Sequence, residues 1–448
     1  MTRLSYDKGT ILVKGDVRVP YTTWDPRTNC YRAMALHYRD VVEYLELSKV
    51  EFSDEVLDTI PCPIFQASEI KLRGYQEEAL DAWLRAGKKG TIVLPTGAGK
   101  TVVAMEAISL LNEATIVIVP TLDLVDQWRG RLEEEFSIKI GLLGGGSYEI
   151  EAVTVATYDS AYIHAPNLGN RFKLMVFDEI HHLPAPGYSN IAEMFAAPFR
   201  MGLTATYERE DGLHKELPRL VGGKVFEAEI GQLAGKHLAE YDLKIISTDL
   251  TPKEKLEYDK NQNIYLDFLR RNNVKLRTPQ DFRRFVMRSG RDPKAREALL
   301  ARHRARTIAL NSRGKLIALK GILEGHKGDR VLIFTEYNEL VDRISRNFLI
   351  PSITHKTKKE ERKENLGRFR TGEYSTIVTS KVLDEGVDVP EASIGVILSG
   401  TGSKREFRQR LGRILRKKEE KRAILYEIVS KKTSEVISSK RRKRAVGA

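Results

Sequence analysis

The sequence has little cysteine and no long hydrophobic run. Its two cysteines, Cys30 and Cys62, lie far apart and outside any C-x-x-C pair. This usage excludes a disulfide framework and a cysteine-based zinc knuckle, and it fits a reducing compartment. No apolar stretch approaches the ~20 residues that a helix needs to cross a bilayer. The opening stretch, MTRLSYDKGTILVKGDVRVP, lacks the apolar region and cleavage site of a signal peptide, so we expect an intracellular protein.

Positive charge is abundant but unevenly distributed. The 448 residues carry a net charge of +13. Residues 403–448 hold 17 Lys and Arg against 5 Asp and Glu, and residues 270–315 hold 15 against 3, so the rest of the chain has a net charge of −11. Two concentrated basic stretches favour contact with a polyanion. The alternative is a solvated helix face together with a disordered tail.

Short apolar runs alternate with helix-length segments in two successive series. The first series covers residues 91–94, 115–119, 153–157, 174–177 and 201–203, and the second covers 330–334, 375–379, 394–398 and 423–429. Such alternation is typical of a parallel sheet wrapped by helices. The sequence therefore predicts an α/β protein with two parallel-sheet lobes.

Two further segments interrupt the alternation. Short strands, turn signals and a helix near 38–47 predict a small α+β domain at the N-terminus, whose aromatic residues Tyr6, Tyr21, Trp24 and Tyr31 we expect to fill its core. A basic helical stretch at about 250–312 predicts an insertion in the second lobe. The expected division is residues 1–66 for the N-terminal domain, 67–233 for the first lobe and 234–448 for the second lobe with a basic tail.

The helical insertion interleaves aromatic residues with lysines and arginines. The basic side chains are suited to phosphates, and Phe282 and Phe285 are suited either to base stacking or to packing. Because these two phenylalanines are three positions apart on an expected helix, we interpret them as core residues.

The stretch LPTGAGKT (residues 94–101) follows an apolar strand and opens a helix. Gly97 and Gly99 let the backbone amides and the helix N-terminus approach phosphate oxygens closely. Lys100 is placed to reach the β and γ phosphates, and the Thr101 hydroxyl is a ligand for Mg²⁺. Leu94 stands where the strict G-x-x-x-x-G-K-[ST] pattern has its first glycine, but the strand–loop–helix context still predicts a phosphate-binding loop.

The stretch VFDEIHHL brings two carboxylates and two imidazoles together at the end of another apolar run. Asp178 at the strand end is suited to hold Mg²⁺, and Glu179 is suited to act as a base toward water. A zinc peptidase would instead place its histidines at i and i+4 on a helix, whereas His181 and His182 are consecutive. We therefore favour a nucleotide-bound Mg²⁺ over a zinc site.

A series of motifs in fixed order resembles the superfamily 2 helicases of the D-E-x-H type. The series is LRGYQ (72–76), PTGAGKT (95–101), VPTLDLVDQW (119–128), DEIH (178–181), TAT (204–206), DEGVDVP (384–390) and QRLGRILR (409–416). YEREDG (207–212) is similar to the Arg-Glu-Asp element of the XPB helicases, and the layout resembles the archaeal type of that family. The resemblance implies two RecA-like lobes, an N-terminal damage-recognition-like domain and a thumb-like insertion.

The same resemblance implies an ATP-dependent DNA helicase or translocase of 3'-5' direction, with a role in DNA repair and with ATP and Mg²⁺ as cofactors. Its implied partners are single-stranded or forked duplex DNA and a nuclease or repair-factor protein. No association with a membrane is implied. Its implied location is the cytoplasm, at the nucleoid of an archaeal cell, or the nucleus of a eukaryote. Three alternatives stay open: a duplex DNA translocase with little unwinding, an RNA-dependent helicase, and a nucleic-acid-binding scaffold with an inactive nucleotide site.

Residue by residue, the resemblance assigns four sets of side chains. The catalytic set is Lys100, Glu179, His181, Gln409, Arg413 and Arg416, with His181 bridging the nucleotide to Gln409. The nucleotide-binding set is Arg73, Gln76, Pro95, Thr96, Gly97, Ala98, Gly99, Lys100, Thr101, Gly386 and Asp388, with Gln76 near the adenine. The metal set is Thr101 and Asp178, and the DNA-coupling set is Thr204, Thr206, Arg209, Glu210 and Asp211. Two alternatives remain: Gln76 as an ordinary helix-start residue, and the Arg-Glu-Asp element as a surface charge cluster.

Replacing Arg413 by alanine tests the implied role of the second lobe. The resemblance places Arg413 and Arg416 at the γ-phosphate when ATP closes the two lobes, where an arginine neutralises charge on the transferring group. Arg413→Ala should therefore lose ATP hydrolysis by ~10³-fold or more in a steady-state phosphate-release assay. Wild-type hydrolysis in this variant would contradict the lobe-closure mechanism.

Overall fold

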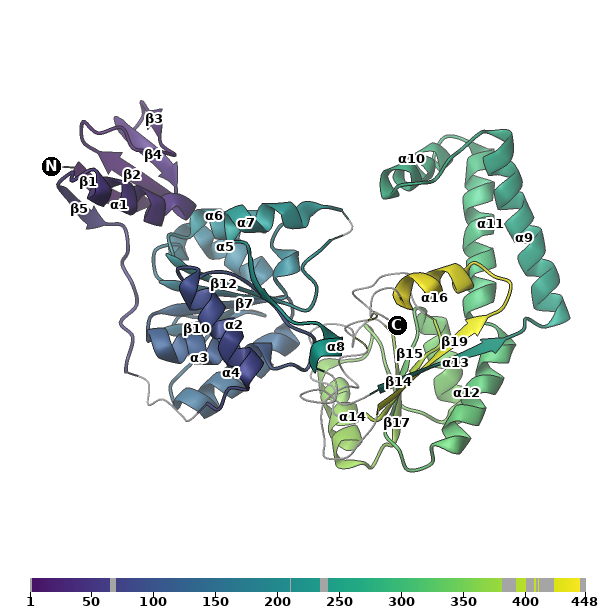
Figure 1. Cartoon of the computed structure of the whole chain (residues 1–448). Helices are drawn as coiled ribbons and strands as arrows, with labels where there is room; N and C mark the ends of the chain where they lie inside the picture. The colour runs from purple at the N-terminus through teal and green to yellow at the C-terminus, as the bar shows by residue number, and fades with distance from the viewer. Residues whose placement is uncertain are drawn as a thin grey trace. The chain divides into compact units, whose positions relative to one another are not determined.

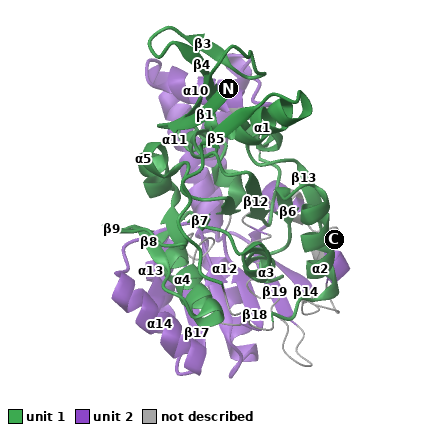
Figure 2. Ribbon diagram, turned by 90° about the vertical axis from the view of Figure 1, so that its left-hand side faces the viewer, with its two compact units in different colours: residues 1–229 green, residues 230–448 purple. Residues whose placement is uncertain are grey.

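The chain forms two compact units, residues 1–229 and 230–448 (Figure 2). The computed structural model describes residues 2–64, 70–209, 211–233, 241–380, 392–399, 407, 410 and 423–443. Within these ranges, no helix has the length and apolar character needed to cross a membrane. The first unit combines the N-terminal domain with the first lobe, and the second unit holds the second lobe and the helical insertion (Figure 1).

The N-terminal domain is a small sheet that packs against the helix α1. Its elements are β1 (Thr2–Asp7), β2 (Thr10–Lys14), β3 (Thr23–Asp25), β4 (Cys30–Met34), β5 (Phe52–Glu55), the 3-10 turn η1 (Ala35–His37) and α1 (Tyr38–Leu47). The strand order is β3-β4-β2-β1-β5, with antiparallel pairs except for the parallel pair β1–β5. Alternate residues of β1 and β2 face inward, so that Leu4, Ile11 and Val13 pack with Val41 and Leu45 of α1.

The aromatic residues of this domain lie in two different environments. Tyr6 is partly buried, and its hydroxyl donates a hydrogen bond to the backbone carbonyl of Met194 in the first lobe (3.0 Å). Burial raises the pKa of Tyr6 to about 12, so the hydroxyl keeps its proton and donates. Tyr21 stacks on His37 and is 61% exposed, and Trp24 is 47% exposed. The expectation that all four aromatic residues fill the core is wrong for Tyr21 and Trp24, because a sheet this small cannot bury every ring around its edge strand β3.

The first lobe is an eight-stranded sheet surrounded by helices (Figure 1). Its strands are β6 (Lys89–Val93), β7 (Thr115–Val119), β8 (Gly141–Gly144), β9 (Ser147–Glu149), β10 (Val153–Thr157), β11 (Leu174–Asp178), β12 (Phe199–Thr204) and β13 (Lys224–Glu227). Its helical segments are α2 (Gly74–Arg85), α3 (Lys100–Leu111), α4 (Leu122–Phe136), α5 (Tyr158–Leu168), η2 (Ile180–His182), α6 (Ser189–Met194), η3 (Leu213–Glu216) and α7 (Leu217–Leu220). The strand order is β13-β6-β12-β11-β7-β10-β8-β9. Strands β7, β10 and β11 are buried along their whole length, as in a parallel sheet covered on both faces.

The second lobe repeats this architecture with a six-stranded sheet. Its strands are β14 (Tyr241–Thr248), β15 (Val331–Phe334), β16 (Ser352–Ile353), β17 (Thr376–Thr379), β18 (Ile394–Ile397) and β19 (Ala423–Ser430), in the order β14-β19-β18-β15-β17-β16. Its helices outside the insertion are α8 (Ile230–Leu233), α12 (Arg313–Gly325), α13 (Asn338–Phe348), α14 (Lys359–Thr371) and α16 (Glu435–Lys443). All described strand pairs of this sheet are parallel, which confirms the predicted α/β fold with two parallel-sheet lobes.

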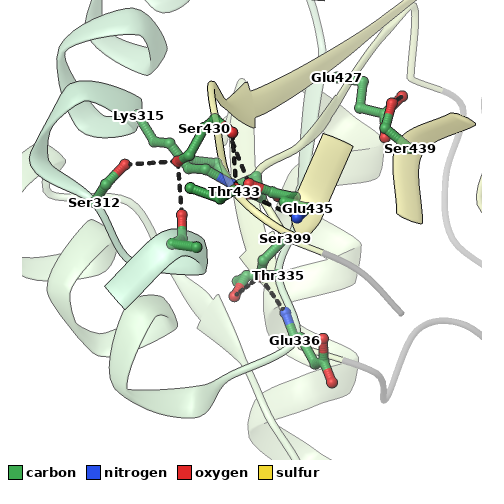
Figure 3. Close-up of polar contacts among 12 residues, drawn as sticks. Ser312, Lys315, Thr335, Glu336, Ser399, Glu427, Ser430, Thr433, Glu435 and Ser439 are labelled. Carbon is green, nitrogen blue, oxygen red and sulfur yellow. Dashed lines mark hydrogen bonds and ion pairs between the residues drawn. The ribbon is translucent and has the colours of Figure 1, made fainter. Parts of the chain in front are cut away.

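A buried ion pair joins α12 to α16 in the second lobe (Figure 3). Lys315 is fully buried, and its ammonium group donates to the Glu435 carboxylate (2.5 Å) and to the Leu398 carbonyl (2.6 Å). The other carboxylate oxygen of Glu435 accepts the backbone amide of Ser430 (2.9 Å), whose hydroxyl lies 3.1 Å from that of Ser312. A buried charge without partners costs several kcal/mol. Loss of either charged partner would therefore leave the other buried and uncompensated. The network holds the end of β19 against the start of α12.

The helical insertion consists of α9 (Pro252–Arg271), α10 (Pro279–Ser289) and α11 (Pro293–Leu310), with α9 and α11 side by side (Figure 1). Each helix begins with proline directly after a capping side chain, which sets a sharp helix start. Phe268 and Phe285 pack with Ala295 of α11, and Phe282 packs at the margin of this cluster with the Arg302 guanidinium over its ring. The core interpretation of the two phenylalanines is therefore confirmed for Phe285, which is buried, while Phe282 is half-buried.

A fully buried arginine supports the strand that leads into the candidate site. The guanidinium of Arg200, at the start of β12, donates to four backbone carbonyls at distances of 2.6 to 3.1 Å. These carbonyls belong to Ala192, Phe195, Ala197 and Leu220. Burial lowers the pKa of Arg200 to about 9, which still leaves it protonated at neutral pH. One side chain thus satisfies carbonyl groups of α6, of the loop between α6 and β12, and of α7.

Removing this guanidinium should destabilise the first unit. Arg200→Met keeps most of the apolar volume but leaves four buried carbonyls without their donor, at a cost of about 3 kcal/mol in the free energy of unfolding. Urea unfolding followed by tryptophan fluorescence measures this unit, because Trp24, Trp83 and Trp128 all lie in it. The control is Arg219→Met, because the Arg219 side chain is 46% exposed and its ion pairs should be worth no more than ~1 kcal/mol. Equal losses of unfolding free energy in the two variants would contradict the structural role assigned to Arg200.

Candidate active site

Three neighbouring strands of the first lobe end at the same edge of the sheet. Strands β6, β12 and β11 are adjacent, and both pairings are parallel. The loop that begins at Leu94 follows β6, Thr204 ends β12, and Asp178 ends β11. Since the carboxyl ends of parallel strands meet at one edge, segments far apart in the sequence come together there. This edge is the candidate active site.

The loop after β6 has a backbone that requires glycine. Gly97 and Gly99 adopt φ angles of 84° and 78°, and α3 begins at the next residue, Lys100. A Cβ at Gly99 would lie 2.3 Å from the side-chain nitrogen of Gln76, so a larger residue would strain the backbone and would also displace the Gln76 amide. The loop therefore directs the N-terminal amides of α3, with Thr101 in the first turn, out of the end of the sheet.

The polar groups of this loop fit a bound phosphate chain. The Thr96 hydroxyl is buried and has no hydrogen-bond partner within the described part of the chain. The Lys100 ammonium rests 3.3 Å from the Leu94 carbonyl, a single contact for a group with three donors. The free amides of a helix N-terminus, a lysine and an unsatisfied hydroxyl are the groups that bind phosphate oxygens in nucleotide sites. The residues of this loop thus suit the β and γ phosphates of ATP.

Gln76 contacts the phosphate-binding loop from the start of α2. Its side-chain nitrogen donates to the Ala98 carbonyl (2.9 Å), and its side-chain oxygen accepts the backbone amide of Arg73 (2.8 Å). The Tyr75 hydroxyl donates to the same Ala98 carbonyl (2.7 Å). Gln76 therefore caps α2 and supports the loop after β6 at the same time. Its proposed contact with adenine stays a prediction, as does the role of Arg73, whose side chain is exposed.

The two carboxylates at the end of β11 have different environments. Asp178 is buried; one carboxylate oxygen accepts the indole N–H of Trp128 (2.9 Å), and the other accepts the amide of Glu179 (3.0 Å). Burial and the neighbouring Glu179 raise the pKa of Asp178, while Lys100 and these two hydrogen bonds oppose the rise. Glu179 adopts φ 49°, a left-handed conformation that is uncommon for a residue with a side chain and that clusters at functional sites.

His181 links Glu179 to the end of β12. Its ring is buried, and Nδ1 lies 3.3 Å from both the Glu179 carboxylate and the Thr204 hydroxyl. The Thr204 hydroxyl donates to the Thr206 carbonyl (2.9 Å) and accepts the Thr206 amide (3.0 Å). The centroids of the His181 and His182 rings lie 4.3 Å apart. Among the described residues, no three His, Cys, Asp or Glu side chains gather as a metal-binding group.

The segment after β12 folds back onto this cluster through Arg209. Its guanidinium pairs with the Asp211 carboxylate through two hydrogen bonds (3.0 and 2.7 Å) and also donates to the His181 carbonyl. The Arg209 hydrogen bonds hold the pKa of Asp211 at about 2, so Asp211 is ionised at neutral pH. The Arg-Glu-Asp element is thus in contact with a residue of the candidate active site. Its action on DNA stays a prediction, as does the alternative of a surface charge cluster.

The structure brings together the part of the predicted site that lies in the first lobe. Six predicted residues lie outside the described residues: Glu210, Gly386, Asp388, Gln409, Arg413 and Arg416. Trp128 lies within the motif at 119–128, but the sequence analysis assigned it no role. The available signal was its chemistry, because a buried tryptophan usually needs an acceptor for its indole N–H.

Three family models match successive parts of the chain. Residues 4–56 match the xeroderma pigmentosum group B helicase damage recognition domain, residues 69–209 match the type III restriction enzyme res subunit, and residues 300–446 match the ERCC3/RAD25/XPB C-terminal helicase. The crystal structure of the Pyrococcus furiosus Hef helicase domain is similar with a TM-score of 0.59 and 19% identity, covering 85% of this chain and 100% of that one. This likeness concerns the fold alone.

Relatives in archaea and bacteria resemble most of the chain. The DNA 3'-5' translocase XPB2 of Sulfurisphaera tokodaii is 46% identical over 443 residues, which cover 99% of this chain and 100% of the relative. The DNA 3'-5' helicase XPB of Mycobacterium tuberculosis is 30% identical over 81% of this chain, which spans 61% of that relative. The XPB models that match the two ends of the chain and the full-length identity to an XPB2 protein indicate the same family. The chain belongs to the XPB family of helicases.

Proposed function

We propose that this protein is an ATP-dependent DNA helicase or translocase that moves 3'-5' and opens DNA during repair. The observation that carries the proposal is the assembly of Lys100, the Asp178–Glu179 pair and Thr204 at three adjacent strand ends. Full-length similarity to a DNA 3'-5' translocase supports the direction and the substrate. The basic helical insertion and the basic stretch at 403–448 provide positive charge for a nucleic acid.

The residues of the first lobe have distinct roles in the proposed hydrolysis. The amides at the start of α3, the Thr96 hydroxyl and the Lys100 ammonium bind the phosphates of ATP. Thr101 and Asp178 hold Mg²⁺, which would neutralise phosphate charge when bound. Glu179 accepts a proton from the attacking water, and His181, 3.3 Å from its carboxylate, holds that carboxylate in place.

Hydrolysis is coupled to DNA through the contacts that run from His181 to the segment after β12. Thr204 bonds both His181 and the backbone at Thr206, and Arg209 bonds the His181 carbonyl. A shift of His181 on nucleotide binding therefore moves the segment 204–211. In this proposal Gly386, Asp388, Gln409, Arg413 and Arg416 keep the roles toward the nucleotide that the resemblance implies for them, and a nuclease or repair factor is the protein partner.

A duplex DNA translocase that separates few base pairs is the second candidate. It is favoured by the name of the Sulfurisphaera tokodaii relative, which is called a translocase. The two candidates share the nucleotide site and differ only in whether movement along the duplex separates its strands.

ATP hydrolysis with different polymers tests the proposed function. Wild-type protein should hydrolyse ATP faster with single-stranded or duplex DNA than with RNA, and Lys100→Ala should lower the rate at least ~100-fold because it removes a cation from the phosphates. The matched control is Lys139→Ala, since Lys139 is an exposed lysine of the same unit. Equal stimulation by RNA would contradict the DNA assignment, and no hydrolysis by the wild type would contradict the enzyme assignment.

Thr204→Val tests the coupling. Valine keeps the shape of threonine but removes the hydroxyl that contacts His181 and Thr206, so unwinding should fall ~10- to 100-fold, and further than ATP hydrolysis falls. A forked-duplex unwinding assay beside a phosphate-release assay measures both. Thr91→Val is the control, because Thr91 is equally buried on the neighbouring strand β6 and its hydroxyl has no hydrogen-bond partner among the described residues. Similar losses in the two variants would mean that packing, and not this hydroxyl, matters.

A further inference from the structure

The indole of Trp128 reaches the metal-binding carboxylate from a separate helix. Trp128 lies on α4, which begins after the capping residue Thr121, whereas Asp178 ends β11. The Trp128 side chain is 1% exposed, and its N–H donates to Asp178 Oδ2 at 2.9 Å. Because an indole has a single donor in the plane of a rigid ring, this bond has a fixed direction.

Hydrogen bonds hold both the carboxylate and the backbone carbonyl of Asp178. Its Oδ1 atom accepts the Glu179 amide (3.0 Å), and its own backbone carbonyl accepts the hydroxyl of the buried Tyr158 (3.1 Å). An ionised carboxylate accepts about four hydrogen bonds, so each oxygen keeps a lone pair after these contacts. Trp128 and Glu179 together therefore select one rotation of the carboxylate about its Cβ–Cγ bond. Without the indole, the Oδ1 contact is the one hydrogen bond from the described residues that would restrain that rotation.

We propose that Trp128 is a positioning residue that holds Asp178 in the orientation needed to bind Mg²⁺ in the nucleotide complex. The inference rests on the proposed ATP site and adds a residue for which neither the sequence motifs nor the comparisons supply a role. Side chains that orient metal-binding groups typically change metal affinity ~10- to 100-fold when they are removed. The part of nucleotide affinity that depends on Mg²⁺ should therefore depend on the indole N–H.

The same lobe contains a matched control for this interaction. Trp83, on α2, is fully buried, and its indole N–H donates to the Arg200 carbonyl at 2.9 Å. Replacing either tryptophan by phenylalanine removes one buried indole hydrogen bond and a similar volume. Only Trp128→Phe removes a bond to the carboxylate of the candidate site. A general loss of stability should therefore affect both variants, and a loss of metal positioning should affect one.

Calorimetric titration of the full-length protein with ADP, in EDTA and in Mg²⁺, separates the two effects. Trp128→Phe should bind ADP in EDTA within about twofold of the wild type and should lose at least ~10-fold of the tightening that Mg²⁺ provides. Trp83→Phe should keep that tightening. A normal Mg²⁺ response in Trp128→Phe, or an equal loss in Trp83→Phe, would overturn the inference while leaving the proposed function intact. Absence of ADP binding by the wild type would overturn both.

A spectroscopic measurement on the wild type does not require Trp128→Phe to fold. The chain has three tryptophans, so protein labelled with ¹⁵N at the indole gives three N–H signals, and Trp83→Phe identifies one of them by its loss. Adding Mg²⁺ to the ADP complex should shift the signal of Trp128, whose acceptor changes, and leave that of Trp83 in place. If the buried Trp128 signal does not move while Mg²⁺ tightens ADP binding, the proposal is wrong.

Discussion

The parallel pairing of β6, β12 and β11 is the constraint on which the candidate active site depends. Parallel strands in one sheet run in the same direction, so the loops that follow them must leave at the same edge. The order of the three strands places the ends of β6 and β11 on either side of the end of β12. Residues predicted to bind phosphate, to bind metal and to couple hydrolysis to DNA, from positions 94 to 206, thereby become neighbours. The strands themselves are buried on both faces and contribute rigidity, while the loops remain available for chemistry.

Burial makes the polar contacts at this edge mutually dependent. Asp178, His181 and Thr204 are almost completely removed from solvent, so each polar atom lost from the network would leave a partner that water does not reach. Trp128 and the Glu179 amide satisfy Asp178, and Thr204 joins His181 to the next backbone segment. Residues predicted to act at the nucleotide and residues predicted to couple to DNA therefore share one set of hydrogen bonds. Arg200, near the start of the same strand β12, satisfies buried backbone carbonyls of the surrounding segments in the same way.

Local features of the chain were predictable because their signals are local. Helix α3 begins at Lys100, within the stretch 94–101 that the sequence predicts to open a helix, and α1 occupies the predicted range 38–47, since the glycine-rich loop and the apolar spacing lie within a few residues of each element. The catalytic role proposed for the D-E-x-H motif comes from the family resemblance of that motif and stays a prediction. The positions of Tyr21, Trp24 and Trp128 could not be predicted from local signals, because each is decided by what lies opposite the side chain. Tyr21 and Trp24 stay exposed because the small domain has too few residues to cover them, and Trp128 donates to a carboxylate fifty positions away.

The sequence by itself determined the fold class, the family, and the types of residue available for phosphate, metal and base chemistry. These follow from apolar periodicity, from glycine placement and from the order of short motifs, all of which can be read along the chain. Only the tertiary structure decided which of these groups touch. It placed Gln76 against the phosphate-binding loop, His181 between Glu179 and Thr204, and the indole of Trp128 on Asp178. The physical reason is that hydrogen bonds extend only about 3 Å, so their partners are set by sheet order and helix packing and not by distance along the sequence.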